Sequence, residues 1–209
     1  MAKLIGNAPN QVPTNADLGK MAFEDKVSVA NLNATGTKDA TTFLRGDNTF
    51  ASAGITMADQ WRLTATTNTG TDADVATNWE RNDSTAYASL GTGMTESSGV
   101  FSFPETGLYY IVYTTIIDMD STDPNVSVRM FVTLNNSSYT RVGRGFSGNG
   151  SSTSGVLTTF TNTYIFNVTD ITNIKFKFQT NNFDAGTFLV GSTSEQYTGF
   201  SILRIGDSQ

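Results

Sequence analysis

The sequence predicts an all-β protein, an antiparallel β-sandwich of the jelly-roll type that is preceded by an extended N-terminal segment. Threonine is its commonest residue, and Gly, Ser and Asn are also abundant, which is typical of strands joined by many turns. The 14 Phe and 7 Tyr supply large side chains for a sheet core. About nine strand-like segments follow residue 55 with no helical pattern between them, which favours a sandwich over alternating strands and helices.

The predicted strands are apolar or alternating runs separated by turns rich in glycine and asparagine. Residues 126–134 alternate cleanly, with Val126, Val128 and Met130 on one side and polar positions such as Arg129 on the other. Residues 174–180 alternate in the same way, so both segments are predicted to lie in an outer sheet that has one wet face. The strands are expected at 57–67, 85–91, 99–103, 107–117, 126–134, 138–144, 155–168, 173–180 and 196–205.

Two segments, 107–117 and 197–205, differ from these because apolar side chains occupy both of their faces. One face belongs to the core of the domain, and the other needs a second apolar neighbour. A second chain is the leading interpretation, and the alternative is a central strand covered by a loop. The side chains assigned to the interface between chains are Tyr109, Ile111, Tyr113, Ile117, Phe200 and Ile202.

Residues 1–54 differ in composition from residues 55–209. They hold too few apolar residues to build a core, so they must pack against copies of themselves or against a partner. The sequence therefore predicts an N-terminal anchor and neck over residues 1–54 and a jelly-roll head over residues 55–209. The residues expected to contact the anchoring partner are Leu4, Ile5, Pro9, Val12 and Pro13.

The composition argues against an enzyme. The chain contains no Cys and no His, which removes thiolate chemistry, disulfides and every nucleophile that relies on a histidine base. The Glu residues of the head show no spacing that indicates the paired carboxylates of a glycosidase. We therefore expect neither enzymatic activity nor a cofactor. These Glu residues are Glu80, Glu96, Glu105 and Glu195.

The charge is uneven along the chain. Residues 1–54 hold five Lys and Arg against five Asp and Glu, whereas residues 55–209 hold eight against fourteen, so the net charge of −6 belongs to the head. An acidic head argues against nucleic-acid binding. No segment has the pattern of a signal peptide or of a membrane span, so we expect no insertion into a membrane.

Three runs in the head resemble the globular domain of the complement-q and tumour-necrosis-factor superfamily. They are GVFSFPETGLYYIVYTTI, NVSVRMFVTLNN and EQYTGFSILRIG. The resemblance covers about residues 56–206, and it implies a jelly roll that forms a tight homotrimer through the sheet holding the Gly-Leu-Tyr-Tyr and Tyr-x-Gly-Phe strands. The matching positions are Phe101, Phe103, Pro104, Gly107, Tyr109, Tyr110, Asn135, Tyr197, Gly199 and Phe200.

Two N-terminal runs, NQVPTNADLGKMAFEDK and GTKDATTFLRGDNTFA, resemble the N-terminal and neck segments of bacteriophage tail-fibre proteins. This resemblance implies a virion location, attachment to other virion proteins through the N-terminus, and contact of the head with a glycan or protein of the host surface. Two alternatives stay open: a capsid-decorating head fibre or baseplate component without a receptor role, and a polysaccharide depolymerase tip.

The long polar connections are the candidate binding regions, because successive strands of a jelly roll place alternate loops at opposite ends. Connections 118–125, 145–154 and 182–194 are expected together at the free tip, away from the end where the chain enters and leaves. Phe183, Phe188 and Leu189 can instead pack beneath the loop. The candidate residues are Phe146, Asn149, Ser152, Asn182, Phe183, Phe188 and Leu189.

Asp118, Asp120 and Asp123 form a D-x-D-x-x-D run in the first of these connections. Closely spaced carboxylates can hold a hard cation such as calcium. The run lacks the glycine and the distal glutamate of an EF-hand loop, and the alternative is a solvated acidic turn. Arg45, Gly46 and Asp47 match an integrin-binding tripeptide but are interpreted as a turn of the neck.

Overall fold

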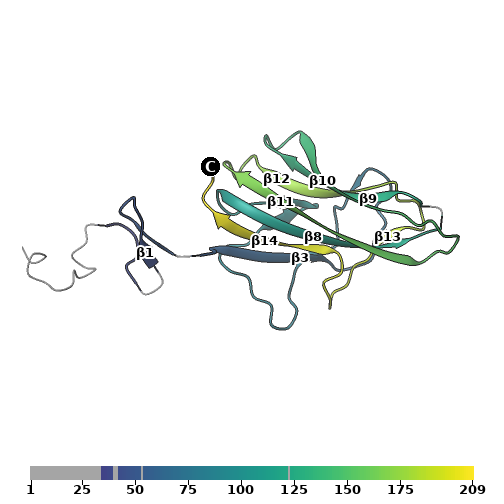
Figure 1. The fold of residues 1–209 in the computed structure, drawn as a ribbon, viewed down its shortest axis with the longest axis horizontal. Coiled ribbons are helices and arrows are strands. Elements are labelled where there is room, and N and C mark those ends of the chain that lie inside the picture. Colours follow the sequence, from purple (N-terminus) through teal and green to yellow (C-terminus); the bar gives the residue numbers. More distant parts are fainter. Residues whose placement is uncertain (1–33, 40–41, 53, 122) are drawn as a thin grey trace, which may run out of the picture. The chain divides into compact units, whose positions relative to one another are not determined.

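The computed structural model describes residues 34–39, 42–52, 54–121 and 123–209, which form strands, turns and loops and no helix (Figure 1). It therefore holds no helix, within these ranges, that could cross a membrane. Contacts divide the chain into two units, Met1–Ala53 and Gly54–Gln209, and each is described here by itself. The larger unit confirms the predicted all-β sandwich.

The described part of the first unit contains a small antiparallel hairpin of β1 (Thr42–Leu44) and β2 (Phe50–Ser52). Gly46 and Asp47 lie in its turn. The Asp47 carboxylate accepts hydrogen bonds from the hydroxyl and the backbone N–H of Thr49, and these bonds lower the pKa of Asp47. The Arg-Gly-Asp tripeptide thus belongs to the turn of a hairpin.

The second unit is a sandwich of two six-stranded antiparallel sheets. Its strands are β3 (Met57–Leu63), β4 (Ala73–Asp74), β5 (Trp79–Arg81), β6 (Thr95–Ser97), β7 (Val100–Ser102), β8 (Gly107–Met119), β9 (Val126–Thr133), β10 (Tyr139–Ser147), β11 (Val156–Val168), β12 (Lys175–Asn181), β13 (Phe188–Leu189) and β14 (Gly199–Gly206). One sheet has the order β10-β9-β12-β7-β6, with β4 also paired to β12; we call it the outer sheet. The other has the order β11-β8-β14-β3-β5, with β13 also paired to β8; we call it the inner sheet.

Eight of the nine expected strands are present, and the strand expected at 85–91 is wrong. That segment is a loop, because Ala86 has a positive φ of 67° and the Tyr87 side chain turns inward to donate a hydrogen bond to Asp59. Strands β4, β5, β6 and β13 are only two or three residues long, too short to show a periodicity in the sequence.

Two buried charged residues of β3 form ion pairs with the long connection between β3 and β7. The carboxylate of Asp59 pairs with Arg81 at 2.9 Å. Arg62 is fully buried, and its guanidinium lies 2.8 Å from a carboxylate oxygen of Glu80 and 2.6 Å from one of Asp83. A buried charge without a partner is costly, so these pairs fix the loops in place.

The core lies between the sheets, and Phe101 of β7 is at its centre. Its ring stacks on Phe176 of β12 with centroids 5.2 Å apart. From the inner sheet, Phe200, Trp61 and Trp79 meet it edge to face at 4.8, 5.4 and 5.2 Å. Such edge-on contacts stabilise aromatic pairs beyond the area they bury. This one ring therefore joins strands of both sheets.

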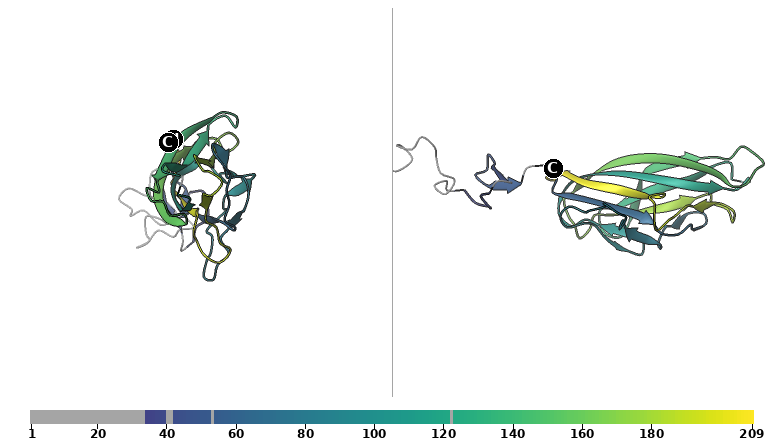
Figure 2. Two further views of the ribbon diagram at one scale, coloured as in Figure 1. Left: turned by 90° about the vertical axis from the view of Figure 1, so that its right-hand side faces the viewer. Right: turned by 90° about the horizontal axis from the view of Figure 1, so that it is seen from below.

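The head has two different ends. At one end Met57, near the start of β3, pairs with Arg204 of β14, and the C-terminal Gln209 bonds with Asn167 (Figure 2). At the other end, the backbone N–H groups of Asn149 and Asp184 both donate to Asp123. Long connections therefore share the end away from the chain's entry and exit, as the alternation of strands predicted.

We expect Ile111→Ala to destabilise the fold of the protomer itself. Ile111 is fully buried in the core, so truncation leaves a cavity and should cost about 2–5 kcal/mol in the free energy of unfolding. Chemical denaturation measures this cost. Thr95→Ala on β6, where the side chain is exposed, is the matched control and should change it by less than about 0.5 kcal/mol; similar losses in both variants would contradict the assignment of Ile111 to the core.

Candidate functional site

The structure corrects the choice of interface residues. All six side chains assigned to contact between chains lie in the core of the single chain, each with at most 1% of its surface exposed. They point toward the outer sheet and belong to the same core as its large side chains, such as Phe176 and Phe178. The sequence showed that both faces are apolar but not which face meets the second sheet. The corrected residues are Tyr109, Ile111, Tyr113, Ile117, Phe200 and Ile202.

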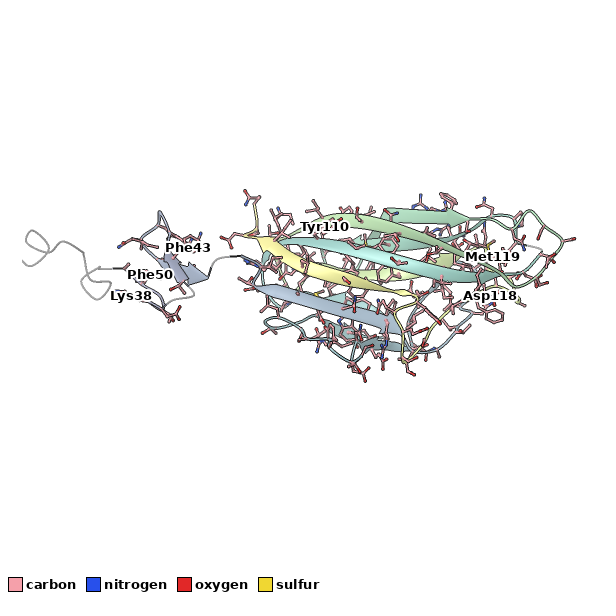
Figure 3. The ribbon with its side chains drawn as sticks, turned by 60° about the horizontal axis from the view of Figure 1, so that its bottom comes forward. Lys38, Phe43, Phe50, Tyr110, Asp118 and Met119 are labelled. Atoms are coloured by element: carbon pink, nitrogen blue, oxygen red, sulfur yellow. The ribbon has the colours of Figure 1, made fainter. Side chains whose placement is uncertain are left out.

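The opposite face of the inner sheet carries an apolar row that the described residues leave uncovered. The strand register places Ile165 opposite Tyr110, Tyr110 opposite Leu203, and Leu203 opposite Ala58. Ile165 is 55% exposed, and Tyr110 and Leu203 are partly exposed. Figure 3 shows Tyr110 toward one end of β8 and Asp118 toward the other. We call these four side chains the inner-sheet row.

A second apolar feature, which the sequence did not reveal, lies along the open edge between β10 and β11. Two adjoining hollows of about 340 and 260 Å³ share Val132, Leu134 and Tyr164 in their walls. Leu134 is 73% exposed, an unusual degree for a leucine that follows a strand. The only signal in the sequence was that this leucine continues the buried face of β9 beyond the strand. We call this feature the edge groove.

Toward the other end of the same edge the two sheets touch. The ring of Phe160 on β11 lies over Gly145 on β10, where a Cβ would come within 2.0 Å of it. The side-chain amide of Asn162 donates to the carbonyl of Arg144 at 3.1 Å. The edge is thus closed near the long loops and open near the tight turns.

The long connections form a tied cluster at the loop end. The side-chain amide of Asn149 donates to the carbonyls of Asp120 and Thr153, and the Thr187 hydroxyl accepts a bond from the Asp120 N–H. Three of the predicted binding residues are buried and support the loops from beneath: Asn149, Phe183 and Leu189. The other four are exposed or partly exposed: Phe146, Ser152, Asn182 and Phe188.

The three aspartates of the D-x-D-x-x-D run do not form a metal site. The described residues contain no group of three or more acidic side chains able to hold an ion. One Asp120 oxygen accepts bonds from Ser121, and Asp123, which is 6% exposed, accepts the N–H of Asp184. Asp118 lies within β8. Asp120 and Asp123 thus bind groups of the loop, and the structure gives no support for calcium at these three aspartates.

Two of the carboxylates considered for catalysis are engaged in ion pairs. Glu80 pairs with buried Arg62, and Glu105 lies 3.3 Å from the guanidinium of Arg204. Glu96 accepts the backbone N–H of Gly99. The anchor residues Leu4, Ile5, Pro9, Val12 and Pro13 lie outside the described residues, so their role stays a prediction.

Comparisons with known proteins agree with the fold. No protein-family model matches the chain, and no curated protein sequence matches it. Among solved structures, "Structure of Eiger TNF from S. frugiperda" aligns with a TM-score of 0.56 at 13% identity, over 75% of this chain and 95% of that one. "Crystal structure of murine APRIL at pH 5.0" aligns with a TM-score of 0.52 at 9% identity, over 71% and 98%. The head is therefore similar in fold to tumour-necrosis-factor-like jelly rolls.

Burial of Tyr113 leads to a testable pH dependence. Burial raises the pKa of Tyr113 from its usual 10.0 to about 12. The unfolded chain therefore releases the phenol proton of Tyr113 at a lower pH than the folded protein does. The contribution of this phenol to the free energy of unfolding is complete below pH 10 and is lost as the pH rises toward 12. Over this pH range the free energy of unfolding should fall less in Tyr113→Phe than in the unchanged protein, and the difference should be roughly 1–3 kcal/mol. Parallel curves of unfolding free energy against pH would contradict this account.

Proposed function

We propose that this chain is a non-enzymatic structural protein of a bacteriophage virion, a homotrimeric fibre anchored by its N-terminus with a β-sandwich tip that contacts the host surface. The observation that carries the proposal is the inner-sheet row, which stays uncovered in a single chain. The tumour-necrosis-factor-like fold of the head supports a non-catalytic assembly, and the likeness of residues 1–54 to tail-fibre segments supports the virion location.

A cyclic trimer needs two different surfaces that fit each other, because each subunit presents one patch to its left neighbour and another to its right. The head has two such apolar surfaces. The inner-sheet row is a strip of apolar side chains that includes Tyr110 and Leu203, whereas the edge groove is a hollow lined by Leu134 and Tyr164. Packing the row of one chain into the edge groove of the next would bury both.

The edge groove adjoins the inner-sheet row on the same chain, since Ile165 belongs to the row and also lines one hollow of the groove. Three chains turning about one axis could therefore cover both surfaces without leaving an open apolar end. Exposed apolar area of this extent on a soluble domain is typical of an interaction site.

The placement of the loops supports a division between anchor and tip. The head receives the chain near Met57, at the end that also holds the C-terminus, and the long connections lie at the other end. An N-terminal anchor on the virion would thus leave the loop end facing outward. Loops held on a rigid scaffold are common binding regions.

Leu203→Glu should convert the trimer to a monomer. Leu203 lies on the outer side of the inner sheet, so the protomer should still fold, but a carboxylate buried between chains without a partner costs several kcal/mol. Light scattering after gel filtration should show the mass of about three chains for the unchanged protein and 22.5 kDa for the variant. Ser97→Glu on β6 is the control and should stay trimeric; an unchanged mass for Leu203→Glu would refute the interface.

Host contact through the loop end can be tested because the chain has no cysteine. The free Ser152→Cys trimer, labelled at this cysteine with a large maleimide polymer, should no longer compete with virions for adsorption to the host cells. Ser137→Cys, labelled at the tight-turn end, should compete normally. Equal competition by the two labelled proteins would argue against a receptor site at the loop end and favour a purely structural fibre.

The anchor is tested by deletion of residues 2–20. The deleted protein should remain a soluble trimer, because the proposed interface lies within the head, but it should no longer join virions. Copy number per particle, measured by quantitative mass spectrometry, is the readout. Normal incorporation of the deleted protein would place the attachment elsewhere in the chain.

A further inference from the structure

The outer sheet gathers most of the positive charge of an acidic head. Residues 55–209 contain eight Lys and Arg. Five of them share the solvent face of β9, β10 and β12, because on these strands the residues between them point into the core. The five are Arg129, Arg141, Arg144, Lys175 and Lys177. We call this surface the basic face.

The strand register arranges the basic face in rows. In one row Arg141 of β10 lies opposite Phe131 of β9, which lies opposite Lys177 of β12. In the next row Arg144 lies opposite Arg129. Neighbouring strands are about 4.8 Å apart, and positions on one face repeat about every 7 Å along a strand. The cations therefore lie in neighbouring rows, and an irregularity of β10 between Arg141 and Gly143 brings Arg141 and Arg144 to the same face.

Carboxylates neutralise only part of this charge. Asp72 pairs with Arg129 and Asp74 pairs with Lys177, each at 2.6 Å. Among the described residues no carboxylate lies within 4.0 Å of the charged groups of Arg141, Arg144 and Lys175. Three positive charges on this face thus form no ion pair with the described residues.

Arg144 is held in place on the edge strand of the basic face. Its guanidinium donates to Ser127 at 3.0 Å and to Asn181 at 2.7 Å, and it lies 4.0 Å from the ring centre of Phe146. Burial lowers its pKa, the charges of Arg129 and Arg141 lower it further, and the charge of Asp72 opposes them only in part. The fold thus tolerates a repulsion among cations that a bound anion would relieve.

Aromatic rings and polar groups lie among the cations. The Nζ of Lys177 lies 4.4 Å from the ring centre of Tyr139. The Nε of Arg129 is buried and has no hydrogen-bond partner within the described part of the chain. Phe146 is 57% exposed at the loop end of this face. Flat rings beside amide and hydroxyl groups are suited to sugar rings and their hydroxyls.

We propose that the basic face binds an acidic polysaccharide, a chain of sugars that bears carboxylate or sulfate groups. The proposal rests on the proposed function, in which the head meets a host surface. Arginine binds carboxylates and sulfates through paired hydrogen bonds, and a polysaccharide supplies such groups at intervals along a flexible chain. The surrounding acidic head and the small number of free cations disfavour a nucleic acid, whose binding requires many phosphate contacts.

The basic face lies on the outer sheet, whereas the inner-sheet row lies on the other sheet of the sandwich (Figure 1). The basic face does border the edge groove, because Thr140 and Val142, on either side of Arg141, line one of its hollows. A trimer would carry three such faces, which would strengthen attachment to a long polymer through multivalency. The oligomeric state is therefore measured beside polysaccharide binding, so that failure of one proposal can be told from failure of the other.

The test measures binding of the full chain to immobilised alginate, dextran sulfate and neutral dextran at low ionic strength. We expect binding to at least one of the two anionic polymers, weakening with added salt, and none to dextran. Alginate binding would identify carboxylate as the recognised group, and dextran sulfate binding would identify sulfate. The double variant R141Q/K175Q should bind at least about tenfold more weakly.

The control is K38Q/R45Q, which removes the same charge from the first unit and should bind as the unchanged protein does. Arg141→Glu is a second variant at one exposed position, should the double variant unfold at a lower temperature. Equal binding by R141Q/K175Q, absence of binding to both anionic polymers, or tighter binding of duplex DNA would each overturn the proposal. Sedimentation of the same samples reports the oligomeric state separately. Absence of polysaccharide binding by an unchanged protein that is trimeric would count against the basic face alone, whereas weaker binding by a trimeric R141Q/K175Q variant would support it.

Discussion

Strand β8 is apolar on both faces, and a two-layered sandwich can cover only one of them. The other features of the head follow from how this constraint is met. Tyr109, Ile111 and Tyr113 take the covered face and pack against the outer sheet, which leaves Tyr110 and its neighbours in the inner-sheet row facing away from the core. In the proposed trimer a neighbouring chain covers this face, and the edge groove of that chain offers the complementary surface.

The sequence predicted the strands that have enough residues to show a period. Strands β8, β9, β11 and β12 were expected close to their observed positions. The apolar side chains of β9 and β12 alternate, and β8 and β11 are long runs rich in apolar, aromatic and threonine side chains. The loop ends were also predicted correctly, since they follow from the alternation of strand direction. The segment 85–91 was mistaken for a strand because its side chains serve a buried carboxylate, Asp59, that is distant in sequence.

What periodicity could not decide is which of two apolar faces is the inner one. Phe200 and Leu203 look equally suited to a core, and only the position of Phe101 on the opposing sheet shows that Phe200 belongs there. The net charge likewise did not predict where charged side chains gather on the surface. A head with fourteen acidic residues still places five cations on one face, because the register of three strands brings together residues that are separated by up to 48 positions in the chain.

The central claim is that the uncovered face of the inner sheet is buried between copies of the chain. Sedimentation equilibrium of the unchanged full-length protein at micromolar concentration tests it most directly. We predict a single species with a mass of about three times 22.5 kDa that persists on dilution. A stable species of 22.5 kDa across that range would contradict the account, because the inner-sheet row would then remain exposed to water in the native protein.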